Sequence, residues 1–149
     1  DDAQKCSIDD ILPLYFNIWK KLANDEITGV IEISKDIKKI VLEKKNLLSC
    51  KKAILDKIES TAVKFATLSD IKAIRVEFSG LSEAIIPQVK NNKDIFVFRC
   101  TMALDGKGAN WLQKDKEIKN PYFGKAMLKC GEEVGKASKA KEDHSMHNH

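Results

Sequence analysis

The sequence predicts a mainly α-helical protein, built as an antiparallel four-helix bundle followed by a short strand–loop–helix appendage. Three observations support this fold class. Apolar residues recur at three- and four-residue steps through residues 8 to 92, the links between these periodic segments are short, and a β-type run begins near residue 95. Steps of three and four residues place side chains on one helical face. Short links favour antiparallel packing of neighbouring helices.

The first two expected helices each carry one continuous apolar face. Asp10 is the expected cap of the first, which leaves Pro13 in the first turn, where a missing N–H has little effect. The first face consists of Ile8, Ile11, Tyr15, Ile18 and Leu22, with Leu12, Phe16 and Trp19 beside it. The second face consists of Ile27, Val30, Ser34, Ile37 and Val41.

The third and fourth expected helices repeat this pattern. Ser69 is the expected N-cap of the fourth helix, and Pro87 is expected to end it. The third face carries Ile54, Ile58, Ala62 and Phe65. The fourth carries Ile71, Ile74, Phe78, Leu81 and Ile85. Because the first and third helices begin on the same side of an up-down bundle, this arrangement allows a Cys6–Cys50 disulfide; two unpaired thiols are the alternative.

The appendage is expected to contain one strand and one short helix. Residues 95–98 form the β-type run, and if the chain stays extended, alternation places Phe96, Phe98, Cys100 and Met102 on one face. In residues 120–131, Asn120 fits an N-cap, Pro121 a first helical residue and Gly131 a C-terminal stop. This short helix would present Phe123, Met127 and Cys130 on one face.

Composition excludes several classes of function. The chain has 149 residues, a net charge of +4 and no apolar run long enough for a membrane span. Lysine alternates with acidic residues, and arginine occurs only at Arg75 and Arg99, which argues against a nucleic-acid interface. All histidines lie in the last six residues, so a buried Ser-His-Asp or Cys-His arrangement cannot form. Residues 106–108 are too short for a phosphate-binding loop, and we expect no enzyme.

Two pairs of sulfur residues form the first candidate metal site. Cys100 and Met102 would share the strand face, and Met127 and Cys130 would share the face of the short helix. If that helix packs on the strand, two thiolates and two thioethers converge, a ligand set that suits Cu(I) or Ag(I). The alternatives are a Cys100–Cys130 disulfide with the methionines filling the core, or free buried thiols.

The chain end forms the second candidate site. Residues 135–149 are expected to be a flexible tail on a folded domain of residues 1–134. Histidines clustered in a short tract can bind Cu(II), Cu(I), Zn(II) or Ni(II). The tail's candidate ligands are His144, Met146, His147 and His149. The alternative is a solvated tail, or residues added for purification.

Several of these segments together resemble a known family. They include residues 98–103, 109–112 and 118–124 and the Met-Leu-Lys-Cys-Gly run of residues 127–131, with Arg75-Val-Glu-Phe-Ser-Gly-Leu-Ser upstream. The pattern, which spans residues 8 to about 134, is similar to bacterial domain-of-unknown-function family 3347. The family's usual Cys-Pro-Met is Cys100-Thr101-Met102 here, so the proline that would stiffen the turn is absent.

The resemblance implies an exported helical domain associated with heavy-metal efflux membrane-fusion proteins of the copper/silver type. It therefore predicts an extracytoplasmic copper- or silver-binding protein that acts as a buffer, a carrier or an accessory to efflux. A start at Asp1 fits a processed, exported protein or a trimmed chain, and an even number of cysteines fits an oxidising compartment. The competing interpretation is a disulfide-stapled helical interaction module without metal.

Overall fold

The computed structural model describes residues 7–47, 50–89 and 92–136. Within these ranges the chain is mainly helical and carries a small three-stranded antiparallel sheet. The long helices are α1 (Leu12–Ala23), α2 (Val30–Lys44), α3 (Lys52–Thr67) and α4 (Ile71–Ile85). A 3₁₀ turn, η2 (Ile86–Val89), contains Pro87 and follows α4. The predicted order of helices is therefore confirmed.

The predicted apolar faces form the core. On α1, Tyr15, Ile18 and Leu22 are fully buried, and the matching positions of the other helices are buried or half-buried. Two predicted caps are wrong. Asp70 caps α4, because its Oδ1 accepts a hydrogen bond from the Lys72 backbone N–H, in place of the predicted Ser69. The N-cap position of α1 is occupied by Ile11, which makes no side-chain cap bond, in place of Asp10.

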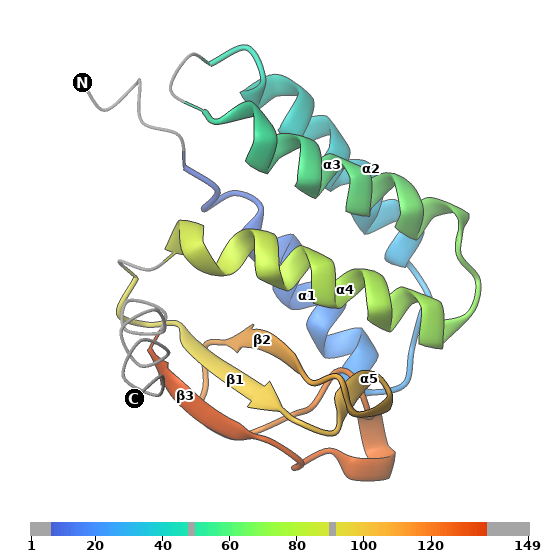
Figure 1. The fold of residues 1–149 in the computed structure, drawn as a ribbon. Helices are drawn as coiled ribbons and strands as arrows, with labels where there is room; N and C mark the ends of the chain where they lie inside the picture. The colour runs from blue at the N-terminus through green and yellow to red at the C-terminus, as the bar shows by residue number, and fades with distance from the viewer. Residues whose placement is uncertain (1–6, 48–49, 90–91, 137–149) are drawn as a thin grey trace.

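The helices and the sheet lie in layers. Figure 1 shows α2 beside α3, with α1 and α4 between that pair and the sheet. The sheet contains β1 (Phe96–Cys100), β2 (Ala109–Gln113) and β3 (Glu132–Lys136), in the order β2-β1-β3. The predicted strand–loop–helix appendage is therefore corrected to a sheet with both neighbours of β1 antiparallel to it.

An aromatic cluster joins the helices to the sheet. The rings of Tyr15 and Phe78 stack with centroids 4.8 Å apart, and Tyr122 lies 5.9 Å from Phe78 and also 5.9 Å from Trp111. The Tyr15 hydroxyl accepts a hydrogen bond from the Leu112 backbone N–H of β2. The sheet is thus an integral part of the core.

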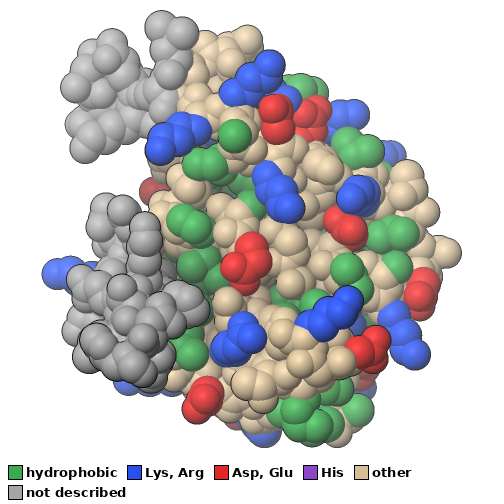
Figure 2. Space-filling model, viewed as in Figure 1, with side chains coloured by type: hydrophobic (Ala, Val, Ile, Leu, Met, Phe, Trp, Pro, Cys, Tyr) green, Lys and Arg blue, Asp and Glu red, His purple; other side chains and the backbone are tan. Residues whose placement is uncertain are grey.

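The outer surface carries mixed charge. Figure 2 shows Lys and Arg interspersed with Asp and Glu over the displayed face, as expected for solvated helix surfaces. Among the described residues, none of the helices has both the length and the apolar character required to cross a membrane.

Candidate metal-binding site

Two cysteines from different segments meet at one end of the sheet. Cys100 is the last residue of β1 and is fully buried. Cys130 lies just before β3, is half-buried, and has its Sγ 3.3 Å from the Sγ of Cys100. Both are free thiols, since a disulfide requires a sulfur–sulfur distance of about 2.05 Å. The hydrogen bond to Cys100, together with desolvation, raises the pKa of the Cys130 thiol above its ordinary value.

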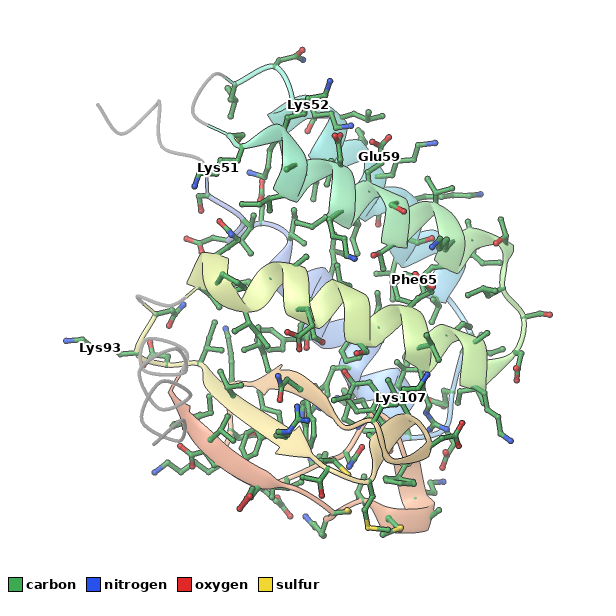
Figure 3. The ribbon with its side chains drawn as sticks, viewed as in Figure 1. Lys51, Lys52, Glu59, Phe65, Lys93 and Lys107 are labelled. Carbon is green, nitrogen blue, oxygen red and sulfur yellow. The ribbon has the colours of Figure 1, made fainter. Side chains whose placement is uncertain are left out.

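The two methionines lie near these cysteines in sequence and are solvent-accessible. Met102 is 56% exposed and Met127 is 37% exposed, so neither fills the core. Because β1 ends at Cys100, the predicted strand face does not extend to Met102, which precedes a tight turn. Figure 3 shows sulfur atoms gathered at this end of the sheet.

The turn after Met102 has an unusual backbone. Leu104 and Asp105 have φ values of 54° and 59°, and Gly106 follows with 88°. Each non-glycine residue in this left-handed region costs about 1–2 kcal/mol. The turn, labelled α5 (Ala103–Gly106), reverses the chain so that Cys100 pairs with Ala109 of β2. Cys100 therefore lies four residues before Leu104, where the strained part of the turn begins.

A buried asparagine, Asn120, holds the two ends of the segment that carries Cys130 together by hydrogen bonds. The Oδ1 of Asn120 accepts hydrogen bonds from the backbone N–H groups of Tyr122 and Phe123, at 2.7 and 3.1 Å. Its Nδ2 donates to the carbonyl of Cys130, at 2.6 Å. Asn120 thus makes the predicted capping bonds. The predicted helix over residues 120–131 is wrong, however, because only the 3₁₀ turn η3 (Gly124–Met127) forms.

Gly131 allows the backbone next to Cys130 to pack directly against Trp111 of the core. Its φ is 135°, and a Cβ there would lie 2.9 Å from Cη2 of Trp111. The position predicted as a helix stop is therefore a site of close packing, where a side chain would collide with the indole. This contact fixes the backbone immediately after Cys130.

An arginine that sequence reasoning did not assign to the site anchors the same segment. Arg75 of α4 donates through Nε to the Pro121 carbonyl at 2.7 Å and through Nη2 to the Leu22 carbonyl at 2.8 Å. It also pairs with Asp25, whose other oxygen accepts the Lys125 backbone N–H. The sequence offered two signals for Arg75: arginine occurs only twice in the chain, and Arg75 begins one of the runs that resemble the known family, although neither gave it a structural role.

Asp25 gives this anchor a testable pH dependence. The Lys125 backbone N–H and the Arg75 guanidinium lower the pKa of Asp25 below its ordinary value. A carboxyl group whose pKa is lower in the folded state than in the unfolded state stabilises the fold when the pH is above its unfolded-state pKa. This stabilisation is lost as the pH falls through the folded-state pKa. Asp25→Asn accommodates the left-handed backbone of this residue, φ 60°. We expect the variant to be less stable than the native chain at pH 6 and the difference to shrink below about pH 4.

Urea unfolding of both proteins from pH 6 to pH 2 measures this difference. The comparison cancels the titration of carboxylates that both proteins share. A difference that stays constant across this range would show that the Asp25 charge makes no contribution.

The remaining predicted ligands lie outside the described residues. These are His144, Met146, His147 and His149, and Cys6 of the predicted Cys6–Cys50 pair lies there as well. Their roles stay predictions. In residues 7–47, 50–89 and 92–136, no group of three or more His, Cys, Asp or Glu side chains is arranged to hold a metal ion. A metal at this end of the sheet would need the two thiolates and thioether sulfur.

Comparison with known proteins adds no relative. No family model matches the chain, and no curated protein and no solved structure matches it. The resemblance to bacterial domain-of-unknown-function family 3347 therefore stays a prediction based on the motifs quoted above.

Proposed function

We propose that this protein binds copper or silver outside the cytoplasm, as a buffer, a carrier or an accessory to a heavy-metal efflux membrane-fusion protein. The observation that carries the proposal is the Cys100–Cys130 thiol pair, with Sγ atoms 3.3 Å apart and one exposed thioether near each cysteine in sequence. Thiolate and thioether sulfur are the ligands that Cu(I) prefers.

The distance between the sulfurs is compatible with a small adjustment on binding. Metal–thiolate bonds of about 2.3 Å allow two sulfurs on one ion to lie up to roughly 4.6 Å apart. The Sγ atoms, now 3.3 Å apart, would therefore separate by at most about 1.3 Å, within the reach of side-chain rotation. Half-buried Cys130 gives the ion access to the thiol pair from solvent.

We also infer the arrangement that supports the site. The four helices serve as an antiparallel bundle, and the sheet packed on α1 and α4 presents the cysteines at its end. In this proposal the tail ligands His144, Met146, His147 and His149 capture an ion and deliver it to the sulfur site. Weak imidazole and thioether ligands would allow rapid exchange of the ion.

Anaerobic titration with Cu(I) against a chromophoric Cu(I) chelator tests the proposal. We expect the native chain to bind one ion more than Cys100→Ala or Cys130→Ser, because each substitution removes one of the two thiolates. A chain ending at Ala140 should retain the sulfur site and lose only binding by the tail. Met102→Leu combined with Met127→Leu should weaken the sulfur site while leaving both thiols in place.

Thr101→Ala provides the matched control, since it changes an exposed residue next to Cys100 and removes no sulfur. Binding to this variant should equal that of the native chain. If the native chain and both cysteine variants bind equally, the sulfur site is wrong. If the native chain binds no tighter than a generic histidine peptide, the copper proposal fails as a whole.

The thiol pair also favours a second candidate, a disulfide-stapled interaction module without metal. The sulfurs need to approach by little more than 1 Å to reach the length of a disulfide. Thiol counting on protein isolated without reductant separates the two functions. Protein that carries a permanent Cys100–Cys130 disulfide and resists reduction while folded fits the module and not the sulfur metal site.

A further inference from the structure

The two paired thiols differ in their access to solvent. Cys100 has no exposed surface, because it is part of the hydrophobic core at the end of the central strand β1. Cys130 is half-buried and precedes β3. A reagent from solvent therefore meets the sulfur of Cys130 first. The sulfur of Cys100 lies behind it, 3.3 Å away.

We propose that Cys100 and Cys130 form a redox-active dithiol that reacts with low-molecular-weight disulfides, with Cys130 as the attacking thiol and Cys100 as the resolving thiol. The assignment follows from accessibility, because thiol–disulfide exchange requires the attacking sulfur to reach the reagent. The second step needs only a neighbouring thiol within reach of the mixed disulfide. Cys100 is in that position.

The exchange balances without a further reactant. Cys130 loses its proton, and its thiolate attacks one sulfur of the small disulfide, which releases one small thiol and leaves a mixed disulfide on Cys130. Cys100 then loses its proton and attacks the Cys130 sulfur, releasing the second small thiol. The protein is oxidised by two electrons and the small disulfide is reduced to two thiols. An excess of small thiol reverses both steps.

Oxidation and metal binding use the same sulfur atoms. The Cys100–Cys130 disulfide leaves no thiolate at this site, so only the thioethers of Met102 and Met127 remain for a soft ion. The redox state of the pair would then decide whether the site holds Cu(I). This consequence rests on the proposed function, whereas the exchange reaction does not.

Oxidised glutathione is a suitable probe of the exchange. The reduced native chain is incubated with it, blocked with iodoacetamide and mapped by peptide mass spectrometry, which assigns each product to its cysteine. We expect the Cys100–Cys130 disulfide to form and to reopen in excess reduced glutathione. Brief treatment of the reduced native chain with limiting iodoacetamide should label Cys130 well before Cys100.

Single variants trap the intermediate. Cys100→Ala should accumulate a glutathione adduct on Cys130, because the resolving thiol is missing. Cys130→Ser should leave Cys100 largely unmodified, because it is buried. Equal labelling of both cysteines in the folded native chain, or an adduct that persists on native Cys130, would overturn the proposal. The labelling result on the native chain holds even if a variant does not fold.

Cu(I) titration of the reduced and oxidised native chain separates this inference from the proposed function. Binding to the reduced form and the loss of one bound ion on oxidation support both. Exchange without Cu(I) binding in either form refutes the metal site and leaves the redox pair standing. Cu(I) binding without exchange refutes the redox pair alone.

Discussion

Replacing Arg75 with methionine should lower the free energy of unfolding by about 3 kcal/mol, because one guanidinium serves three acceptors. Its Nε donates to the Pro121 carbonyl, and its Nη2 donates to the Leu22 carbonyl and to Asp25. Its side chain is only 12% exposed, so water replaces these bonds poorly. In a chain of this size the loss corresponds to a fall in melting temperature of roughly 6–12 °C. Thermal unfolding followed by circular dichroism measures it.

Lys72→Met is the matched control for Arg75→Met. Lys72 is an exposed cation on the same helix, and its substitution removes the same unit of charge. We expect it to change stability by less than about 0.5 kcal/mol. If the two variants have the same melting temperature, the Arg75 bonds contribute no more to stability than an ordinary surface charge does.

Replacing Asn120 with alanine should lower the free energy of unfolding by about 3 kcal/mol as well, at about 1 kcal/mol for each bond. Asn120 is fully buried, and its amide satisfies the backbone groups of Tyr122, Phe123 and Cys130. The loss should be largest near the segment that carries Cys130. Urea unfolding measures the total effect, and tryptic cleavage after Lys125 and Lys129 reports local opening.

Asn46→Ala makes the same chemical change at an exposed asparagine near the end of α2. It should leave both the urea midpoint and the tryptic cleavage near native values. Faster cleavage of Asn120→Ala at an unchanged midpoint would show that Asn120 orders its own segment without supporting the core.

The helices could be predicted because their signal is local. Burial at positions such as Ile18, Ile37 and Phe65 follows from apolar spacing within each segment. Cys100 and Cys130 lie close together as predicted, but the structural element predicted to bring them together was wrong. No packed helix brings them together; the pairing of β3 with β1 does.

The features that could not be predicted depend on contacts between segments that are distant in the sequence. Residues 132–136 are Glu-Glu-Val-Gly-Lys, which has little strand propensity, and they become a strand through pairing with β1. The bonds of Arg75 join residues 46 and 53 positions away, which no local pattern reveals. The capping chemistry of Asn120 was visible in the sequence. Gly124, at φ 60°, allows a tight turn against Asp25 where a helix was expected.

The hydroxyl of Tyr15 ties the two halves of the molecule into one cooperative unit. It is 2.7 Å from the Ser82 Oγ of α4 and accepts the Leu112 N–H of β2, so one side chain of α1 bonds a helix and a strand at once. Separating the sheet from the helices would leave this buried hydroxyl without its hydrogen bond to β2 and would expose the aromatic rings around it. Events at the cysteine end of the sheet are therefore coupled energetically to the helices, without any need for a hinge or a moving domain.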